Sequence, residues 1–390
     1  MTVAARSLAT SLLIANLVAA CSGEGGAVQG PSSPAEPGAP TAQPSPTAAP
    51  SGAPGSEVTP PAPTGLTFPP ASGSGAWATI DAASAGFDPA KLDELTTWIG
   101  QASSTTFVVL VGGKILVEKY WDATDTTLRD IASAQKSIVS MMVGAAADKG
   151  AFGLDDTVTS LVGAGWSNDT PANEDGITVR HLLTMTSGLD DDLMRVAAPG
   201  TVWRYNTNAY HRLELVLTQK TGKTIDQLTR MLFDPIGAGA SAWSPRPFQK
   251  DAKGVPINAL EMSARDMARV GLLVQADGAW NGTRLVPSAY LGTALATSQT
   301  LNPSYGFLWW LNGKSSYVLP PSTPKQGMLM PSAPIDLVAA LGAADQKIYV
   351  SRAANLVVVR QGKSAGAGAQ ALSGFDDELW KRLLAAKKSP

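Results

Sequence analysis

The 390-residue sequence predicts a mixed α/β domain in which strand patterns at both ends of the folded part enclose a mostly helical region. Near the N-terminal end, two apolar runs flank a Gly-Gly pair, which is the pattern of a β-hairpin. Near the C-terminal end, four short apolar runs separated by turn residues indicate strands. Between these two groups, residues 151–300 combine helical periodicity with loops, and no internal repeat appears.

The elements at the N-terminal end follow from local signals. A helix is expected over residues 88–100, because Asp88 is a favourable N-cap and Pro89 suits the first helical position. The β-hairpin is expected over residues 107–120. A long apolar helix follows over residues 133–150, where a glycine ends it.

The C-terminal half contains one more clear helix start before the strands return. Ser263 and Asp266 have the spacing of a capping box, which predicts a helix through Leu273. A terminal helix is expected over residues 373–386. The four expected strands cover residues 307–311, 336–340, 347–350 and 356–360.

The first 21 residues indicate export. Arg6 precedes an apolar stretch over residues 8–17, and small residues then lead to Cys21, the only cysteine of the chain. The stretch is shorter than the ~20 residues of a membrane span, so residues 1–21 are expected to be a secretory signal. The segment resembles a bacterial lipobox, which implies a lipid on Cys21 and anchoring to a membrane of the bacterial cell envelope, on the periplasmic or outer surface. A plain signal peptide or a signal anchor with an incidental cysteine is the alternative.

Residues 22–75 are rich in Pro, Gly, Ala, Ser and Thr and contain almost no large apolar side chains before Leu66 and Phe68. Such a segment cannot bury enough surface to offset its chain entropy. We therefore expect a tether over residues 22–75, followed by one folded domain over residues 76–388.

Charge and composition exclude several functions. The net charge of −2 comes without any basic run, which argues against nucleic-acid binding. The single cysteine excludes an intramolecular disulfide and a cysteine-rich metal site. His181 and His211 are the only histidines and lack metal-ligand spacing, so structural roles are expected for both. No metal or organic cofactor is implied, and a Ser-His-Asp triad is nearly excluded by the histidine count.

The strongest chemical signal is Ser133-Ala-Gln-Lys136 at the head of the long apolar helix. On a helix, residues three positions apart lie on one face about one turn apart. A helix start also directs free backbone N–H groups and the positive end of the helix dipole at Ser133. This turn can therefore supply a nucleophile, a base and half of an oxyanion hole.

Several segments follow this motif in a fixed order, and together they resemble the serine β-lactamase and penicillin-recognising hydrolase superfamily. The similarity is greatest to its class C-like branch, which holds family VIII esterases and 6-aminohexanoate oligomer hydrolases. It extends over about residues 85 to 385. The segments are Ser133–Ser137 with Gly144 and Gly150, Leu154–Asp156, Ile177–Leu189, Pro199–Tyr205, Ser263–Gly271, Tyr305–Trp310 and the last strands through Arg360.

This resemblance implies an α+β sandwich, that is, an antiparallel sheet flanked by helices with an inserted, mostly helical region. The second motif of the family, Tyr-x-Asn, corresponds to Tyr205-Asn206-Thr207. Tyr205 would share proton transfer with Lys136. Thr207 occupies the position where relatives carry the substrate-binding Asn.

The third motif, Lys-Thr-Gly or His-Thr-Gly in relatives, corresponds to Ala340-Leu341-Gly342 and lacks the cation. The resemblance implies that Gly342 borders the substrate and that the N–H of Ala343 is the second oxyanion donor beside that of Ser133. Gln346 and Trp309 are the further expected substrate contacts. Without the cation, a substrate carboxylate near the scissile bond would be buried unpaired, so esters and amides that lack one fit better.

The resemblance implies a serine hydrolase that cleaves small-molecule esters or amides through an acyl-enzyme, with carboxylesterase-like activity as the main expectation. A β-lactamase, a D-amino-acid peptidase and an ω-amino-acid amide hydrolase stay open within the enzyme class. The non-enzymatic alternative is a lipid-anchored protein that captures a cell-wall peptide or a β-lactam. Whether Lys136 or Tyr205 is the general base also stays open.

Three other segments match motifs without the structural context that the chemistry needs. Gly362–Gly366 spells G-x-S-x-G, but no histidine follows it. Lys220-Thr-Gly222 spells the third motif at an expected helix end, where Gly222 suits a C-cap. Ser322–Lys325 spells Ser-x-x-Lys, but the neighbouring prolines forbid a regular helix.

Overall fold

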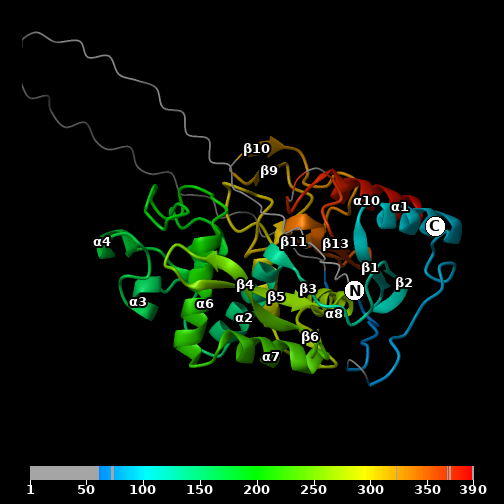
Figure 1. Cartoon of the computed structure of the whole chain (residues 1–390), viewed down its shortest axis with the longest axis horizontal. Coiled ribbons are helices and arrows are strands. Elements are labelled where there is room, and N and C mark those ends of the chain that lie inside the picture. Colours follow the sequence, from blue (N-terminus) through cyan, green and yellow to red (C-terminus); the bar gives the residue numbers. More distant parts are fainter. Residues whose placement is uncertain (1–60, 72–73, 322, 367, 369, 389–390) are drawn as a thin grey trace, which may run out of the picture. The chain divides into compact units, whose positions relative to one another are not determined.

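The computed structural model describes residues 61–71, 74–321, 323–366, 368 and 370–388. Within them, both ends of the domain contribute strands to one six-stranded antiparallel sheet (Figure 1). This confirms the expected fold class. In sheet order the strands are β2 (Lys114–Tyr120), β1 (Ser104–Val111), β13 (Leu356–Gly362), β12 (Gln346–Ser351), β11 (Val338–Gly342) and β8 (Trp310–Leu311).

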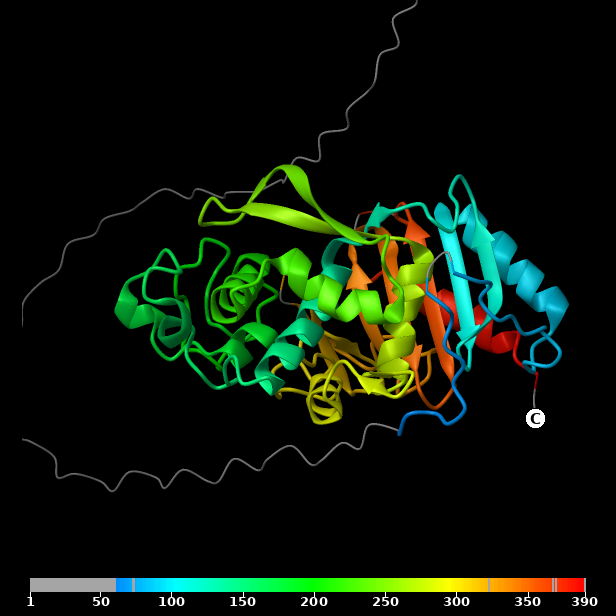
Figure 2. The same ribbon diagram turned by 90° about the horizontal axis from the view of Figure 1, so that it is seen from below.

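Helices cover both faces of this sheet (Figure 2). On one face, α1 (Pro89–Gln101) and α10 (Gly374–Ala385) pack together, and the rings of Trp98 and Phe375 stack with centroids 5.3 Å apart. On the other face, α8 (Ala264–Gln275) approaches closely at Gly271, where a β-carbon would lie only 2.4 Å from a methyl carbon of Val357. The sheet is therefore buried on both sides.

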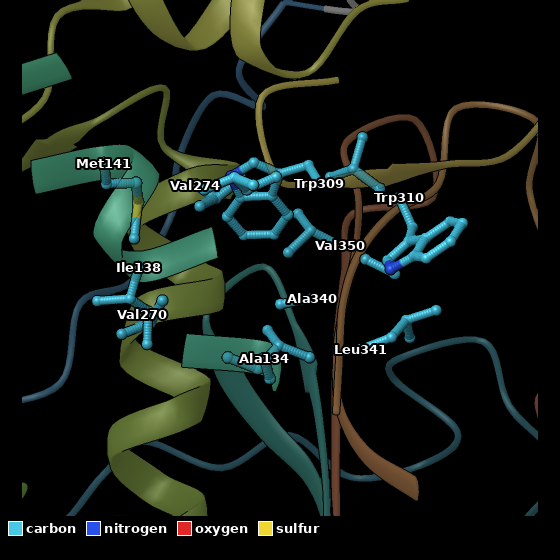
Figure 3. Close-up of a cluster of buried hydrophobic side chains, with 14 of the residues drawn as sticks. Ala134, Ile138, Met141, Val270, Val274, Trp309, Trp310, Ala340, Leu341 and Val350 are labelled. Carbon is cyan, nitrogen blue, oxygen red and sulfur yellow. The ribbon is translucent and has the colours of Figure 1, made fainter. Parts of the chain in front are cut away.

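A hydrophobic core fills the space between α2 (Gln135–Asp148), α8 and the sheet (Figure 3). Ile138 and Met141 of α2, Val270 and Val274 of α8 and Val350 of β12 are almost completely buried there. Burying an aliphatic side chain of this size contributes about 1.5–3 kcal/mol. Because α2 follows directly on Ser133, this packing fixes the turn that carries Ser133 relative to the sheet.

The inserted region is mostly helical, as expected. Thr224 starts one helix with a capping box to Gln227, and Gly222 ends the preceding one with a left-handed φ of 64°, which confirms the expected C-cap. Besides α8, the described helices of this region are α3 (Val158–Val162), α4 (Pro171–Glu174), α5 (Val179–Leu183), α6 (Thr207–Thr221), α7 (Ile225–Ile236) and α9 (Ser288–Ala294).

A second sheet in this region was not predicted. It has the order β3–β5–β4, formed by Arg129–Asp130, Pro256–Met262 and Ala242–Lys250 respectively. The sequence of β4 conceals the strand, because two prolines interrupt it and most of its side chains are exposed rather than alternating. Its pairing with β5 also shifts register between Pro245 and Lys250. This hairpin carries Arg246, which contacts Asp130 and Gln135 on either side of Ser133.

Two of the predicted C-terminal strands differ from the observed ones. The strand expected over residues 307–311 is reduced to β8, because Leu308 has a left-handed φ of 61° that interrupts extended backbone. The strand expected over residues 336–340 begins later, since Asp336 instead accepts hydrogen bonds from the Ser351 hydroxyl at 2.7 Å and from a backbone N–H. The remaining short strands are β6 (Ala279–Trp280), β7 (Thr283–Arg284), β9 (Ser316–Leu319) and β10 (Thr323–Gln326).

The folded domain begins before residue 76, the expected boundary. The Thr67 N–H donates to the Gly112 carbonyl at 2.9 Å, and the Phe68 ring lies 4.7 Å from that of Trp280. The last stretch of the predicted tether therefore belongs to the domain. The predicted signal over residues 1–21, with Cys21, lies outside the described residues. No helix within the described ranges combines the length and apolar character that a membrane crossing requires.

Candidate active site

Ser133 lies in a tight turn, the 3-10 helix η1 (Ala132–Ala134), directly before α2. Its side chain is partly exposed, whereas the residues that follow are buried. Ala132 holds a left-handed φ of 50°, and its N–H donates to the carboxylate of Asp130 at 2.7 Å. A strained residue next to a reactive side chain is typical of a functional turn.

The buried side chain of Lys136 contacts Ser133. Its Nζ lies 3.0 Å from the Ser133 Oγ, and only 4% of the lysine is exposed. Burial first, and then the positive charge of Arg246, lower the pKa of Lys136 to about 7, while the carboxylate of Glu214 opposes the shift. A neutral amine is therefore available near neutral pH to accept the Ser133 proton.

Tyr205 completes the group from the segment that leads into α6. The Lys136 Nζ lies 5.0 Å from its ring centroid. Burial raises the pKa of Tyr205 to about 12, so the phenol stays protonated at neutral pH. Trp310 stacks on its ring with centroids 6.3 Å apart, which holds the ring in place. This favours Lys136 as base and Tyr205 as proton donor.

The opposite wall of the site is the end of β11. A β-carbon at Gly342 would lie 2.2 Å from the Ile131 carbonyl oxygen and 3.2 Å from the Ala134 nitrogen, so β11 lies directly against the Ser133 turn. The 3-10 turn η2 (Ala343–Asp345) begins at the next residue. Ala343, the expected oxyanion donor, is thus next to the residue that contacts the turn of the nucleophile.

Buried side chains hold the η2 turn. Ala344 and Asp345 both have a left-handed φ, and the Arg360 guanidinium donates to the carbonyl oxygens of both residues at 3.1 Å. The Asp345 carboxylate pairs with Lys347, whose Nζ lies 3.1 Å away. The backbone beside Ala343 is therefore fixed before any substrate arrives.

Two of the expected substrate contacts take other roles. Trp309, the residue before β8, is completely buried on the side of the sheet that faces α8, whereas Trp310, the first residue of β8, lies on the opposite side with Leu341 (Figure 3). Trp310 is thus the member of the pair that contacts Tyr205. The Gln346 amide donates to the Gly362 carbonyl at 2.7 Å and to the Ala344 carbonyl at 3.0 Å, so this side chain links two strands instead of facing the site.

The remaining motif positions are clear in the structure. Thr207 is half-buried at the first position of α6, and Asn206 is the N-cap, whose side chain accepts from the Ala209 N–H. Ala340 is completely buried in the core beside Ala134 (Figure 3). The position that corresponds to the family cation therefore contributes only a methyl group.

Four residues behind Lys136 escaped prediction. They form two hydrogen-bonded pairs near the amine: Glu214 accepts from Tyr210 at 3.1 Å, and Gln135 accepts from Arg246 at 2.9 Å. The Lys136 Nζ lies 4.9 Å from the centroid of the Tyr210 ring. The spacing of Tyr210 and Glu214 on α6 was the only available signal. Arg246 was hidden because β4 was not predicted.

The histidines and the chance motif matches supply none of the catalytic groups. His181 forms a capping box with Thr178, and burial, with nearby positive charges, lowers the pKa of His211 to about 3. Thr323–Lys325 form part of β10, and Ser364 follows β13 without a helix. Across the described ranges, no three His, Cys, Asp or Glu side chains gather in a way that could hold a metal ion.

Comparison with known proteins identifies the family of the chain. A family model described as Beta-lactamase matches residues 90–367. The chain belongs to the β-lactamase family. The β-lactamase fold is that of a family of serine hydrolases. The search of curated proteins found no match to the chain.

Three solved structures illustrate the range of this β-lactamase fold. A Bacillus anthracis protein provisionally assigned as a 6-aminohexanoate-dimer hydrolase is 17% identical, with a TM-score of 0.59 over 80% of this chain and 86% of its own. A penicillin binding protein from Bacillus halodurans is 15% identical, with a TM-score of 0.55 over 74% and 98%. EstCE1, a hydrolase with promiscuous acyltransferase activity, is 15% identical, with a TM-score of 0.54 over 77% and 100%. At these identities the likeness concerns the fold.

Proposed function

We propose that this protein is a serine hydrolase that cleaves neutral carboxylic esters through an acyl-enzyme on Ser133. The observation that carries the proposal is the 3.0 Å contact between the Ser133 Oγ and the buried Lys136 amine. A nucleophile within hydrogen-bond reach of a base with a lowered pKa, beside a protonated phenol, is the arrangement that acyl transfer needs.

In the acylation step, neutral Lys136 takes the Ser133 proton while the Oγ attacks the ester carbonyl carbon. The negative charge that develops on the carbonyl oxygen is stabilised by the N–H groups of Ser133 and Ala343. Losing one donor of this kind typically costs ~10²–10³ in rate. As the tetrahedral intermediate collapses, Tyr205 donates its proton to the departing alkoxide and regains one from Lys136.

In the deacylation step, a water molecule attacks the Ser133 ester and gives up a proton to the same Lys136–Tyr205 pair. The bond between the acyl carbon and the Oγ then breaks, and the Oγ regains its proton. The carboxylic acid leaves, and the enzyme returns to its starting state. No group other than water enters the second half-reaction.

The preference for neutral esters rests on the third motif. Ala340 and Leu341 present apolar side chains where relatives carry a cation and a hydroxyl, and both are buried. A substrate carboxylate at that place would lose water without gaining a partner, which is costly. Penicillins and cephalosporins carry such a carboxylate, and short-chain esters do not.

The test compares p-nitrophenyl butyrate with the chromogenic cephalosporin nitrocefin on purified protein, with Ser133→Ala as the blank. The proposal expects repeated turnover of the ester and a kcat/KM ratio of nitrocefin to ester well below one. A ratio above one would favour a β-lactamase, the first alternative. Binding of a β-lactam with neither labelling by a fluorophosphonate nor any turnover would favour a capture protein instead.

A further inference from the structure

Arg246 makes contacts that the hydrolytic steps do not explain. It lies on β4, outside every family motif, and most of its side chain is buried. Its Nε and Nη2 donate to the two carboxylate oxygens of Asp130 at 2.7 and 2.8 Å. The Nη2 also donates to the Gln135 Oε1 at 2.9 Å.

These two partners lie on either side of the nucleophile. Asp130 precedes Ser133 by three residues and Gln135 follows it by two. The Asp130 Oδ1, which accepts from the Arg246 Nη2, also accepts from the N–H of Ala132, the residue with a left-handed φ. Paired donors that reach a carboxylate give a geometry more restrictive than that of a point charge. Arg246 thus joins the entry and the exit of the Ser133 turn.

The hairpin that carries Arg246 is fixed at both ends. Near the site, Gln135 donates to the Asn258 carbonyl and accepts from the Leu260 N–H on β5, both at 3.1 Å. At the far end, Asp251 forms a buried ion pair with Arg212 of α6. These contacts at both ends of the hairpin hold the Arg246 guanidinium in place relative to the Ser133 turn.

The same guanidinium contacts Gln135, the residue directly before Lys136, and its positive charge lowers the pKa of the Lys136 amine. The other polar groups that face Lys136 are Ser133 of η1, Tyr205, and Tyr210, His211 and Glu214 of α6. His211 stays uncharged above pH 4, because its pKa is lowered to about 3. β11, which also packs on α2, has no titratable side chain. Arg246 lowers the pKa of the amine and Glu214 raises it. Burial raises the pKa of Glu214 itself to about 7, so its negative charge is only partly present over the pH range in which Lys136 titrates.

We propose that Arg246 is a positioning residue of the active site, which clamps the turn of Ser133 through Asp130 and Gln135 and supplies a fixed positive charge beside the Lys136 amine. The inference rests on the proposed hydrolytic function. Arg246 touches no reacting atom, and its two effects are separable. The clamp needs the forked shape of arginine, whereas the charge does not.

The experiment follows kcat/KM for p-nitrophenyl butyrate and the labelling rate of Ser133 by a fluorophosphonate, both as functions of pH. Arg246→Met removes clamp and charge, so both rates should fall ~10–100-fold. The acidic limb of each pH–rate profile, where the rate rises as Lys136 loses its proton, should move up by about 0.5–1 pH unit. Arg246→Lys keeps the charge, so the limb should stay in place while the rates fall. Glu214→Gln removes the opposing charge, so the limb should move to lower pH.

The matched control is Arg265→Met. Arg265 of α8 makes an equivalent forked pair with Glu118 of β2, at 2.6 and 2.9 Å, but contacts nothing at the site. It should lose thermal stability without any shift of the acidic limb. If all Arg246 variants keep the wild-type limb and rates, or if Arg265→Met shifts the limb equally, the inference is wrong.

Failure of the proposed function looks different. A wild-type protein that is labelled at Ser133 but turns over no ester contradicts the hydrolase proposal, while the pH dependence of labelling still tests Arg246. Where Arg246→Met does not fold, Arg246→Lys decides: both rates should still fall because the clamp is lost, and wild-type rates in this variant would overturn the inference. Absence of any labelling in the wild type contradicts both.

Discussion

Gly342 lies so close to Ile131 that a β-carbon added to it would sit 2.2 Å from the Ile131 carbonyl oxygen. Real β-carbons do not approach backbone atoms to that distance, so the contact requires glycine. It brings the end of β11 against the turn of Ser133, and Ala343, the expected oxyanion donor, is the next residue of the chain. The relative position of these two segments sets where the two proposed oxyanion donors lie.

Gly342→Ala should therefore separate β11 from the Ser133 turn. We expect kcat/KM for p-nitrophenyl butyrate to fall ~10–100-fold, with an overpacking cost of about 1–3 kcal/mol in the free energy of unfolding. Gly292→Ala is the control, because a β-carbon on that residue of α9 has no heavy atom within 4 Å. Wild-type kinetics in a folded Gly342→Ala protein would contradict a role of β11 in the active site.

The pH profile should report the Lys136 amine. Burial lowers the pKa of Lys136 to about 7 in the folded protein, and only the neutral amine can accept the Ser133 proton. Below pH 7 the amine is mostly protonated and activity should be low. kcat/KM should rise through about pH 7 and level off above pH 8, because Tyr205 stays protonated until about pH 12. The measurement is kcat/KM from pH 5 to 9.5, corrected for spontaneous ester hydrolysis. An acidic limb near pH 10 would contradict the assignment of Lys136 as base.

Trp309 should matter for stability rather than for substrate binding. Its side chain is completely buried in the core, so Trp309→Ala should lower the free energy of unfolding by about 3–5 kcal/mol. Trp309→Phe should keep most of the packing and leave KM unchanged. Urea unfolding and ester kinetics on both variants check this. A several-fold change in KM for Trp309→Phe with little change in stability would restore Trp309 as a substrate contact.

Cys21 is proposed as the site of a lipid anchor. If residues 1–21 are a lipoprotein signal, Cys21→Ser should block processing or release the protein from membranes on cell fractionation. The folded domain expressed from residue 61 onward should remain soluble and active. A correctly cleaved Cys21→Ser protein that stays fully in the membrane fraction would argue for another mode of attachment.

Local signals in the sequence were enough for much of the fold. The Asp88 cap, the Gly-Gly hairpin turn, the Ser263 cap and the strands that became β12 and β13 were predicted close to their observed bounds. Each depends on short-range chemistry, such as a capping side chain, a positive φ or a run of β-branched residues. The spacing of Ser133 and Lys136 likewise follows from helix geometry alone.

What escaped prediction depends on contacts between distant parts of the chain. β4 is exposed, contains two prolines and pairs irregularly, so no local pattern marks it, and Arg246 was hidden with it. The choice between Trp309 and Trp310 depends on where β8 begins, because only Trp310 belongs to this strand of two residues. Gln346 looks like a pocket residue until its partner Gly362, on the next strand, is known.

Covalent labelling tests the central claim most directly. The purified domain is incubated with a fluorophosphonate near pH 8, and the modified peptide is identified by mass spectrometry, with Ser133→Ala and Ser364→Ala in parallel. The account predicts stoichiometric modification of Ser133, none in Ser133→Ala despite an unchanged Tm, and normal modification and ester turnover in Ser364→Ala. Modification of Ser364, or normal turnover by Ser133→Ala, would contradict it.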